Sequence, residues 1–111
     1  MAEYGEWSRK GATLSDKTAR KEYKIEQELI IKGIEFGKLE YRYSAIFGNP
    51  FIRLLRRQLE DYIKEELGSE YLIKATGKIE LKKIKKEISE LEGKLNHLQS
   101  RKAELERVLG R

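Results

Sequence analysis

Basic side chains provide the clearest candidate chemistry in this sequence. Four of them recur at the spacing of one helical face: Lys17, Arg20, Lys21 and Lys24. Four more belong to two predicted paired strands and the residues that follow them directly: Arg42, Arg53, Arg56 and Arg57. Cations gathered on one surface can neutralise several phosphates of a nucleic acid, and such binding weakens steeply with salt. For each residue taken singly, a solvated charged surface is the simpler interpretation.

A second group of candidates lies near the predicted tip of that pair of strands. Ile46 and Phe47 are apolar, and Asn49 follows them in the turn. Apolar side chains at such a position can wedge between base steps or stack on exposed bases, or they can fold back over a small core. Trp7 has the same two alternatives, of which an anchored indole is favoured. Three lysines at the start of the last helix complete the candidate set: Lys82, Lys83 and Lys86.

Residues suited to catalysis or metal binding are scarce. The chain has no cysteine and one histidine, His97, which has no second histidine or cysteine to share a metal ion. There is no glycine-rich loop that could cradle a phosphate, and the acidic pairs lie on a predicted outer helix face. We therefore expect no enzyme activity, no metal and no cofactor.

Charge is distributed unevenly along the 111 residues, whose net charge is +5. Residues 1–24 carry a net charge of +2, residues 25–70 carry −2, and residues 71–111 carry +5. The positive excess therefore lies in the two ends, which favours a nucleic-acid partner less strongly than a uniformly basic domain does. No apolar run is long enough to cross a bilayer and the start has no signal-peptide core, so a cytoplasmic protein without membrane contact is expected.

Two short helices are predicted to position the first basic cluster. Ser15 is a suitable N-cap for the segment SDKTARKEY, with Leu14 packed against Ala19. A tight turn over residues 24–26 leads into QELIIKGIEF, whose apolar residues recur at helical spacing. Gly37 follows where a C-cap glycine usually stands.

A hairpin and a third helix come next. Apolar residues alternate with charged ones over residues 39–43, which is typical of a half-buried strand. The Gly-Asn-Pro sequence at 48–50 predicts the turn, and residues 51–54 return as the second strand. From Leu55 the apolar residues are four apart, and Gly68 closes that helix.

The end of the chain has the most regular pattern. Nine residues alternate three and four apart, at heptad a and d positions: Leu81, Ile84, Ile88, Leu91, Leu95, Leu98, Lys102, Leu105 and Leu109. Such a stripe predicts a coiled-coil helix about 45 Å long that dimerises with a second copy of the chain. Glu87 at g and Glu92 at e would repel in a parallel pair, which favours an antiparallel one. A tetramer remains an alternative.

The order of these elements is that of a winged helix-turn-helix. The segments TARKEYKIEQELIIKGIEFGKLEYRY and FIRLLRRQLEDYI resemble the DNA-binding modules of MerR-type regulators and phage excisionases. The stretches SDKTARKEY, GNP and LGSEYL are similar to the DNA-binding region of the xeroderma pigmentosum group A family of repair proteins. These resemblances imply DNA contact through the hairpin and the basic helices. The cysteine zinc module of the repair family has no counterpart in this chain.

The sequence thus predicts a mainly α fold with a small β-hairpin, in which a winged helix-turn-helix is followed by a long coiled-coil helix. The predicted parts are a flexible arm (1–12), the winged domain (13–68), a connector (69–77) and the coil (78–111). Three carboxylates on the second helix, Glu26, Glu28 and Glu35, argue against reading of base edges there. We expect a non-catalytic protein that binds the DNA backbone and recognises DNA by its shape rather than by its base sequence. The alternative is an adaptor whose acidic second helix and apolar hairpin bind a partner protein.

Overall fold

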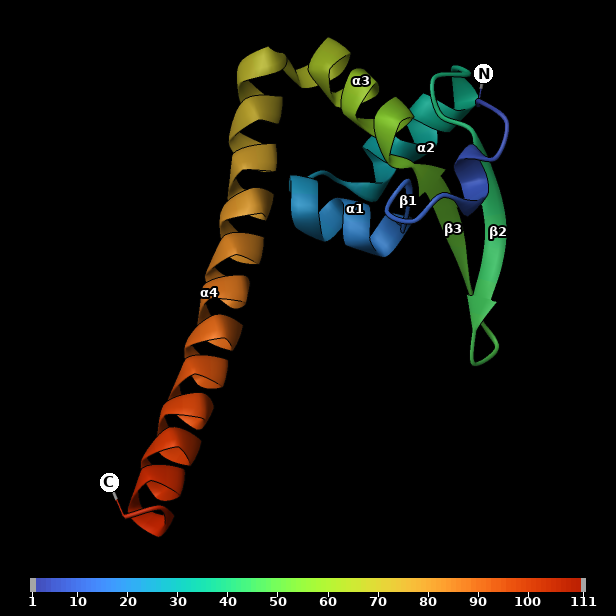
Figure 1. The fold of residues 1–111 in the computed structure, drawn as a ribbon. Helices are drawn as coiled ribbons and strands as arrows, with labels where there is room; N and C mark the ends of the chain where they lie inside the picture. The colour runs from blue at the N-terminus through green and yellow to red at the C-terminus, as the bar shows by residue number, and fades with distance from the viewer. Residues whose placement is uncertain (1, 111) are drawn as a thin grey trace. The chain divides into compact units, whose positions relative to one another are not determined.

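The computed structural model describes residues 2–110, and its elements are mainly helical with one small antiparallel sheet (Figure 1). In chain order they are η1 (Glu6–Ser8), β1 (Thr13–Ser15), α1 (Asp16–Tyr23), α2 (Gln27–Glu35), β2 (Tyr41–Ile46), β3 (Asn49–Leu55), α3 (Arg56–Leu67) and α4 (Ser69–Val108). The chain forms two compact units, Met1–Gly77 and Lys78–Arg111. Met1 of the predicted arm and Arg111 of the predicted coil lie outside the described residues.

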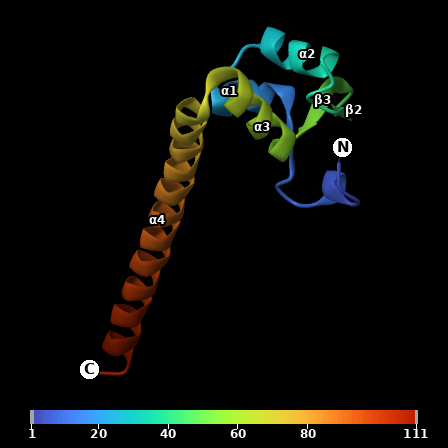
Figure 2. The same cartoon turned by 90° about the horizontal axis from the view of Figure 1, so that it is seen from above.

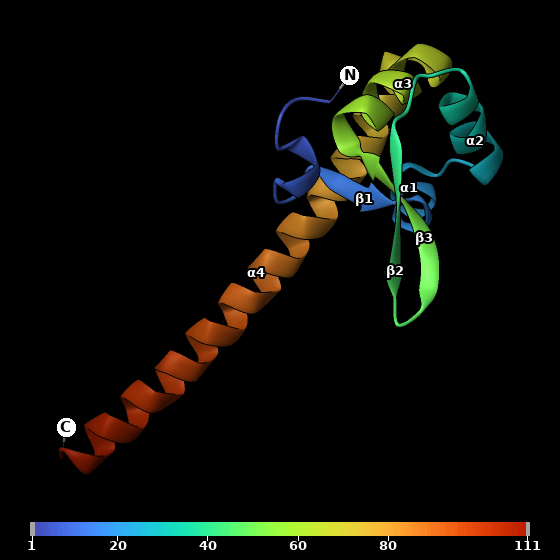
Figure 3. The same ribbon diagram turned by 90° about the vertical axis from the view of Figure 1, so that its right-hand side faces the viewer.

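The sheet has three strands in the order β1-β3-β2, one more than the sequence predicts. Strand β1 pairs with the inner end of β3, where Leu14 lies opposite Leu54. The sequence does not predict β1, because three residues are too few to show an alternating pattern and because the last of them, Ser15, is the N-cap of α1. The β2–β3 hairpin extends past the short helices of the first unit (Figure 3), so its outer half has no helix beneath it.

The hairpin turn begins one residue earlier than predicted and is one residue shorter. Ile46 pairs with Asn49, which leaves Phe47 and Gly48 as a two-residue loop, and both have positive φ angles of 53° and 80°. Two positive φ angles in succession are the geometry of a type I′ turn, which matches the twist of the strands. Pro50 therefore lies within β3, where it is tolerated because only β2 flanks the strand at that point.

The core of the first unit forms where α1, α2 and α3 meet the inner half of the sheet (Figure 2). Its largest fully buried side chains are Tyr23, Ile30, Leu54, Leu55, Leu59, Tyr62 and Ile63. The predicted cap of α1 is confirmed, since the Thr18 amide donates to Ser15 Oγ at 3.1 Å. Helix α2 ends as predicted just before Gly37, whose φ of 74° allows the two backbone hydrogen bonds that close the helix end.

The predicted connector, residues 69–77, is helical. These residues form the first turns of α4, which continues without a break to Val108. Tyr71 attaches this part of α4 to the first unit, because its hydroxyl donates to the carbonyl oxygens of Tyr23 and Lys24 at 2.6 and 2.8 Å. Ala75 is buried there as well.

The second unit is the remainder of α4, and its predicted seam is uncovered. The eight apolar seam residues are each between 41% and 72% exposed: Leu81, Ile84, Ile88, Leu91, Leu95, Leu98, Leu105 and Leu109. Among the described residues, no helix is long and apolar enough to cross a membrane. These seam side chains form a regular apolar stripe along the second unit.

Alanine substitutions at two helical glycines should change the stability of the protein in opposite directions. A Cβ at Gly33 would lie 2.8 Å from Leu39 Cδ1 and from Tyr62 Cε2, whereas a Cβ at Gly93 meets nothing within 4 Å. We expect Gly33→Ala to lower the free energy of unfolding by about 1–2 kcal/mol, because overpacking outweighs the gain in helix propensity. Gly93→Ala should raise helix stability by about 1 kcal/mol. Urea unfolding followed by circular dichroism checks both, and a stabilising Gly33→Ala would contradict the close packing.

Candidate nucleic-acid interface

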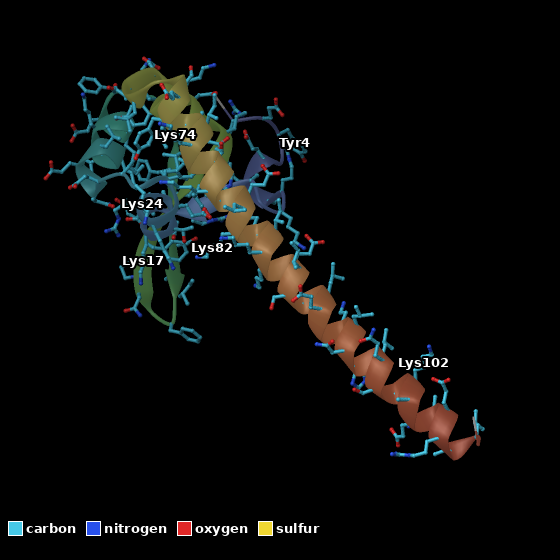
Figure 4. All side chains as sticks on the ribbon, turned by 90° about the vertical axis from the view of Figure 1, so that its left-hand side faces the viewer. Tyr4, Lys17, Lys24, Lys74, Lys82 and Lys102 are labelled. Atoms are coloured by element: carbon cyan, nitrogen blue, oxygen red, sulfur yellow. The ribbon has the colours of Figure 1, made fainter. Side chains whose placement is uncertain are left out.

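Helix α1 presents the predicted cationic face to solvent. Its other side is held in the core by Ala19 and Tyr23, both fully buried, so the residues at the intervening positions face outward. The cations of this α1 face are Lys17, Arg20, Lys21 and Lys24, and all four are exposed (Figure 4 labels the first and the last). Within residues 2–110 none of the four has an acidic partner within 4.0 Å. Their charge is therefore available to a ligand.

The two hairpin arginines lie side by side as predicted, but both are engaged by the N-terminal residues. Arg42 on β2 is the cross-strand neighbour of Arg53 on β3. Arg53 Nη2 donates to the Trp7 carbonyl and to Thr13 Oγ1, both at 3.0 Å. The guanidinium of Arg42 lies over the Trp7 ring, 4.5 Å from its centroid. Neither guanidinium is a freely solvated cation on the wing.

Arg57 is engaged by the residue before the tryptophan. Its Nε and Nη2 donate to the two carboxylate oxygens of Glu6, each at 3.0 Å, in a bidentate pair. Glu6 is 3% exposed, and its hydrogen bonds with Arg57 hold the pKa of that carboxyl below its usual range. The pair therefore contributes stability at neutral pH, and this contribution is lost only as the pH falls through that lowered pKa.

These contacts correct the prediction of a flexible arm over residues 1–12. Trp7 is 9% exposed and stands with Glu6 in η1, so the expected anchoring of the indole is confirmed. The sequence signal for docking was the lone tryptophan. The sequence around Glu6 contains no signal that its carboxylate pairs with Arg57, 51 residues away.

Arg56 belongs to an internal network. It donates to the Tyr23 hydroxyl at 2.8 Å and pairs with Glu22 at 3.5 Å. The Tyr23 hydroxyl in turn donates to Glu60 Oε2 at 2.6 Å. Burial, together with the hydrogen bond to Glu60, raises the pKa of Tyr23, which stays neutral. Arg56 thus holds α1 against α3, a role that sequence spacing did not reveal.

The hairpin tip is fully exposed. Phe47 is 99% exposed and Ile46 is 57% exposed, which excludes the alternative that they fold back over the core. Phe47 also holds a φ of 53°, in the left-handed region that is unfavourable for a bulky side chain. A strained backbone under an exposed aromatic ring is a feature that packing does not require, and such outliers concentrate at functional sites.

Two tyrosines form an aromatic patch on the hairpin face opposite Arg42. Tyr41 and Tyr43 contact each other edge to face with ring centroids 5.4 Å apart, and Tyr43 is 73% exposed. The alternating pattern predicted that this face would be half buried. It is exposed because the hairpin is longer than the core it covers, a length that the alternation does not reveal.

The remaining candidate residues from the sequence are also exposed. Lys82, Lys83 and Lys86 are exposed on α4 in the second unit, and Asn49 is exposed at the start of β3. Glu26, Glu28 and Glu35 are exposed on or beside α2. A mainly apolar groove of about 500 Å³ runs beside α2 and is lined by Ile25, Leu29, Leu67 and Tyr71, with lysines and glutamates at its rim.

No protein family, curated protein or solved structure was found to match this chain. The interface is therefore described by its own residues. It combines an unpaired cationic helix face, an exposed aromatic tip and three arginines that contact Glu6 or Trp7. Among residues 2–110, no three histidine, aspartate or glutamate side chains gather in the manner of a metal site.

Proposed function

We propose that this chain is a non-catalytic DNA-binding protein. In this proposal the first unit is a winged helix-turn-helix, whose α1 face and hairpin wing contact the DNA backbone and groove. The observation that carries it is the strained, fully exposed Phe47 at the wing tip, on the same unit as four unpaired cations of α1. Cations provide affinity through the phosphates, and an aromatic wedge provides contact with base steps.

Recognition in this proposal depends on shape rather than on base sequence. The exposed side of α2 carries Glu28 and Glu35, which repel phosphates and would oppose its entry into a major groove. A surface that holds the backbone and inserts one apolar residue favours DNA that is easily kinked or locally unpaired. Lys82, Lys83 and Lys86 would add further backbone contacts.

The α1 face provides the direct test of this function. Replacing Lys17 and Lys21 with glutamine should weaken binding to duplex DNA and lower the slope of log affinity against log salt by about two, one for each lost phosphate contact. Fluorescence anisotropy at four salt concentrations measures the slope. The matched control replaces Lys38 and Lys64, which are exposed elsewhere in the same unit, so that the net charge is equal. An equal slope change in both variants would contradict a specific role for α1.

The second unit is proposed to dimerise the protein. Its eight exposed apolar residues lie at a and d positions of one heptad register, which fits a second copy of the same helix. Lys102 is the polar residue at an a position, and it would restrict register and oligomer size at some cost in stability.

An adaptor is the second candidate function, and one observation favours it. The apolar groove beside α2 is large enough to accept an apolar side chain of a partner protein, with Glu26 and Glu28 at its rim. If neither duplex, single-stranded nor forked DNA binds at low salt, this groove becomes the first surface to test by substitution of Leu29.

A further inference from the structure

Three arginines converge on two consecutive residues of the chain. Arg42 from β2 stacks over the Trp7 ring, Arg53 from β3 donates to the Trp7 carbonyl, and Arg57 from α3 holds the Glu6 carboxylate. These arginines come from three different elements, and Glu6 and Trp7 are the residues they share. The side chains of both are almost completely buried by the contact.

The Glu6 carboxylate and the Trp7 indole together resemble the phosphate and the base of a nucleotide. The Glu6 carboxylate offers two oxygens to one guanidinium fork, as a phosphate does. The Trp7 indole offers a flat aromatic face to a second guanidinium, as an unstacked base does. The carboxylate stands in for phosphate oxygens and the indole for a nucleobase. One anion and one ring, held by adjacent residues, occupy a surface suited to a single nucleic-acid strand.

We propose that Arg42, Arg53 and Arg57 form a binding site for a single nucleic-acid strand, which the chain's own Glu6 and Trp7 occupy in this structure. The ligand class is a phosphodiester with an unstacked base, and the N-terminal residues compete with it. This inference rests on the proposed function, because it names a ligand and a regulation for the same hairpin.

The covering segment is short. Element η1 has three residues, and its N-cap, Gly5, provides no side-chain hydrogen bond. Tyr4 and the residues from Ser8 to Lys10 are exposed on either side of the buried pair. An open cavity of about 630 Å³ lies beside the stacked ring. Its lining includes the aromatic side chains of Tyr4 and Trp7, the cations of Arg42 and Arg53, and the carboxylates of Glu3 and Glu40. The cavity offers room for a sugar and a phosphate next to the arginines.

Competition of this kind has a measurable consequence. When a site is open only part of the time, the apparent dissociation constant equals the intrinsic one divided by the fraction of molecules in which the site is open. Weakening the attachment of the N-terminal residues should therefore tighten strand binding. If the segment were only structural, the same change would leave binding unaltered or weaken it.

Glu6→Gln is the variant that tests this, since it removes the charge from the bidentate pair and keeps the shape of the side chain. We expect a single-stranded thymidine oligonucleotide to bind Glu6→Gln about three- to tenfold more tightly than the wild type at constant salt. Glu35→Gln is the matched control: it removes one negative charge from the same unit, at an exposed position on α2 that does not line the cavity. That variant should change affinity by less than about twofold.

The gain must depend on Arg57. Adding Arg57→Gln to Glu6→Gln should abolish the increase in affinity, and circular dichroism of each variant checks that the fold is retained. Equal affinity of Glu6→Gln and Glu35→Gln would overturn the inference. So would a gain that persists without Arg57.

A second measurement uses the wild-type chain, so that the inference stays testable if Glu6→Gln does not fold. Trp7 is the chain's one tryptophan, and its emission reports directly on the buried pair. Saturation with the oligonucleotide should move the emission maximum to longer wavelength as the indole leaves its site. An unchanged maximum at saturation would overturn the inference.

Different results would contradict the proposed DNA-binding function and the proposed strand site. If the Lys17 and Lys21 variant loses affinity while Glu6→Gln behaves like Glu35→Gln, the DNA-binding function stands and the competing strand site is wrong. If no protein in the series binds the oligonucleotide or duplex DNA at low salt, both are wrong.

Discussion

Leu95→Glu is expected to convert the proposed dimer into a monomer. Leu95 occupies an a position in the middle of the seam and is 54% exposed in the single chain, so the proposed partner helix would bury it. Each buried leucine contributes about 1.5–3 kcal/mol, and a dimer loses two of them while gaining two carboxylates in an apolar layer. The dissociation constant of the dimer should rise by at least about a hundredfold.

The matched control for this change is His97→Glu. His97 lies two residues away at a c position and is exposed, so the same charge is added outside the seam. Sedimentation equilibrium over a range of protein concentrations measures both dissociation constants. A Leu95→Glu protein that associates like His97→Glu would show that the seam is not the dimer interface.

The direction of the two helices can be read from cysteine cross-links, because the chain has no cysteine of its own. A parallel pair places Lys102 against its own copy in one layer, a repulsive arrangement that an antiparallel pair centred on Gly93 avoids by setting Lys102 against Ile84. We therefore expect Ile88→Cys alone to form no disulfide dimer, and its mixture with Leu98→Cys to form one. Rapid cross-linking of Ile88→Cys alone would indicate the parallel pair.

Phe47→Asn is expected to stabilise the protein and weaken its DNA binding. The backbone at Phe47 is in the left-handed region, which costs a bulky residue about 1 kcal/mol, and an Asn-Gly pair is the preferred sequence for this turn. The free energy of unfolding should therefore rise by about 1 kcal/mol. Loss of an aromatic wedge or stacking platform worth about 1–3 kcal/mol should lower DNA affinity about tenfold. Thermal unfolding and anisotropy measure the two effects.

Phe47→Ala separates the two contributions of this residue. Alanine removes the ring but retains the unfavourable backbone conformation, so affinity should fall as for Phe47→Asn without a gain in stability. Because the Phe47 side chain is 99% exposed, neither change removes a core contact. Unchanged affinity in both variants would show that the tip does not touch DNA.

Local features of this protein follow from its sequence. The cap at Ser15, the glycine end of α2 at Gly37 and the seam of the second unit are each encoded within about two turns of chain, because helical periodicity and capping are local. The outward cations of α1 follow in the same way, since Ala19 and Tyr23 can face only one side.

Tertiary structure alone decided which of the basic residues are free. Arg53 and Arg57 look like the α1 lysines in sequence, yet their partners lie 46 and 51 residues away in the N-terminal segment. Strand β1 is similar, because three residues gain a strand conformation only from the register of β3. Cationic side chains carry no local signal of their partners, so only the packing of distant segments separates the covered arginines from the exposed lysines.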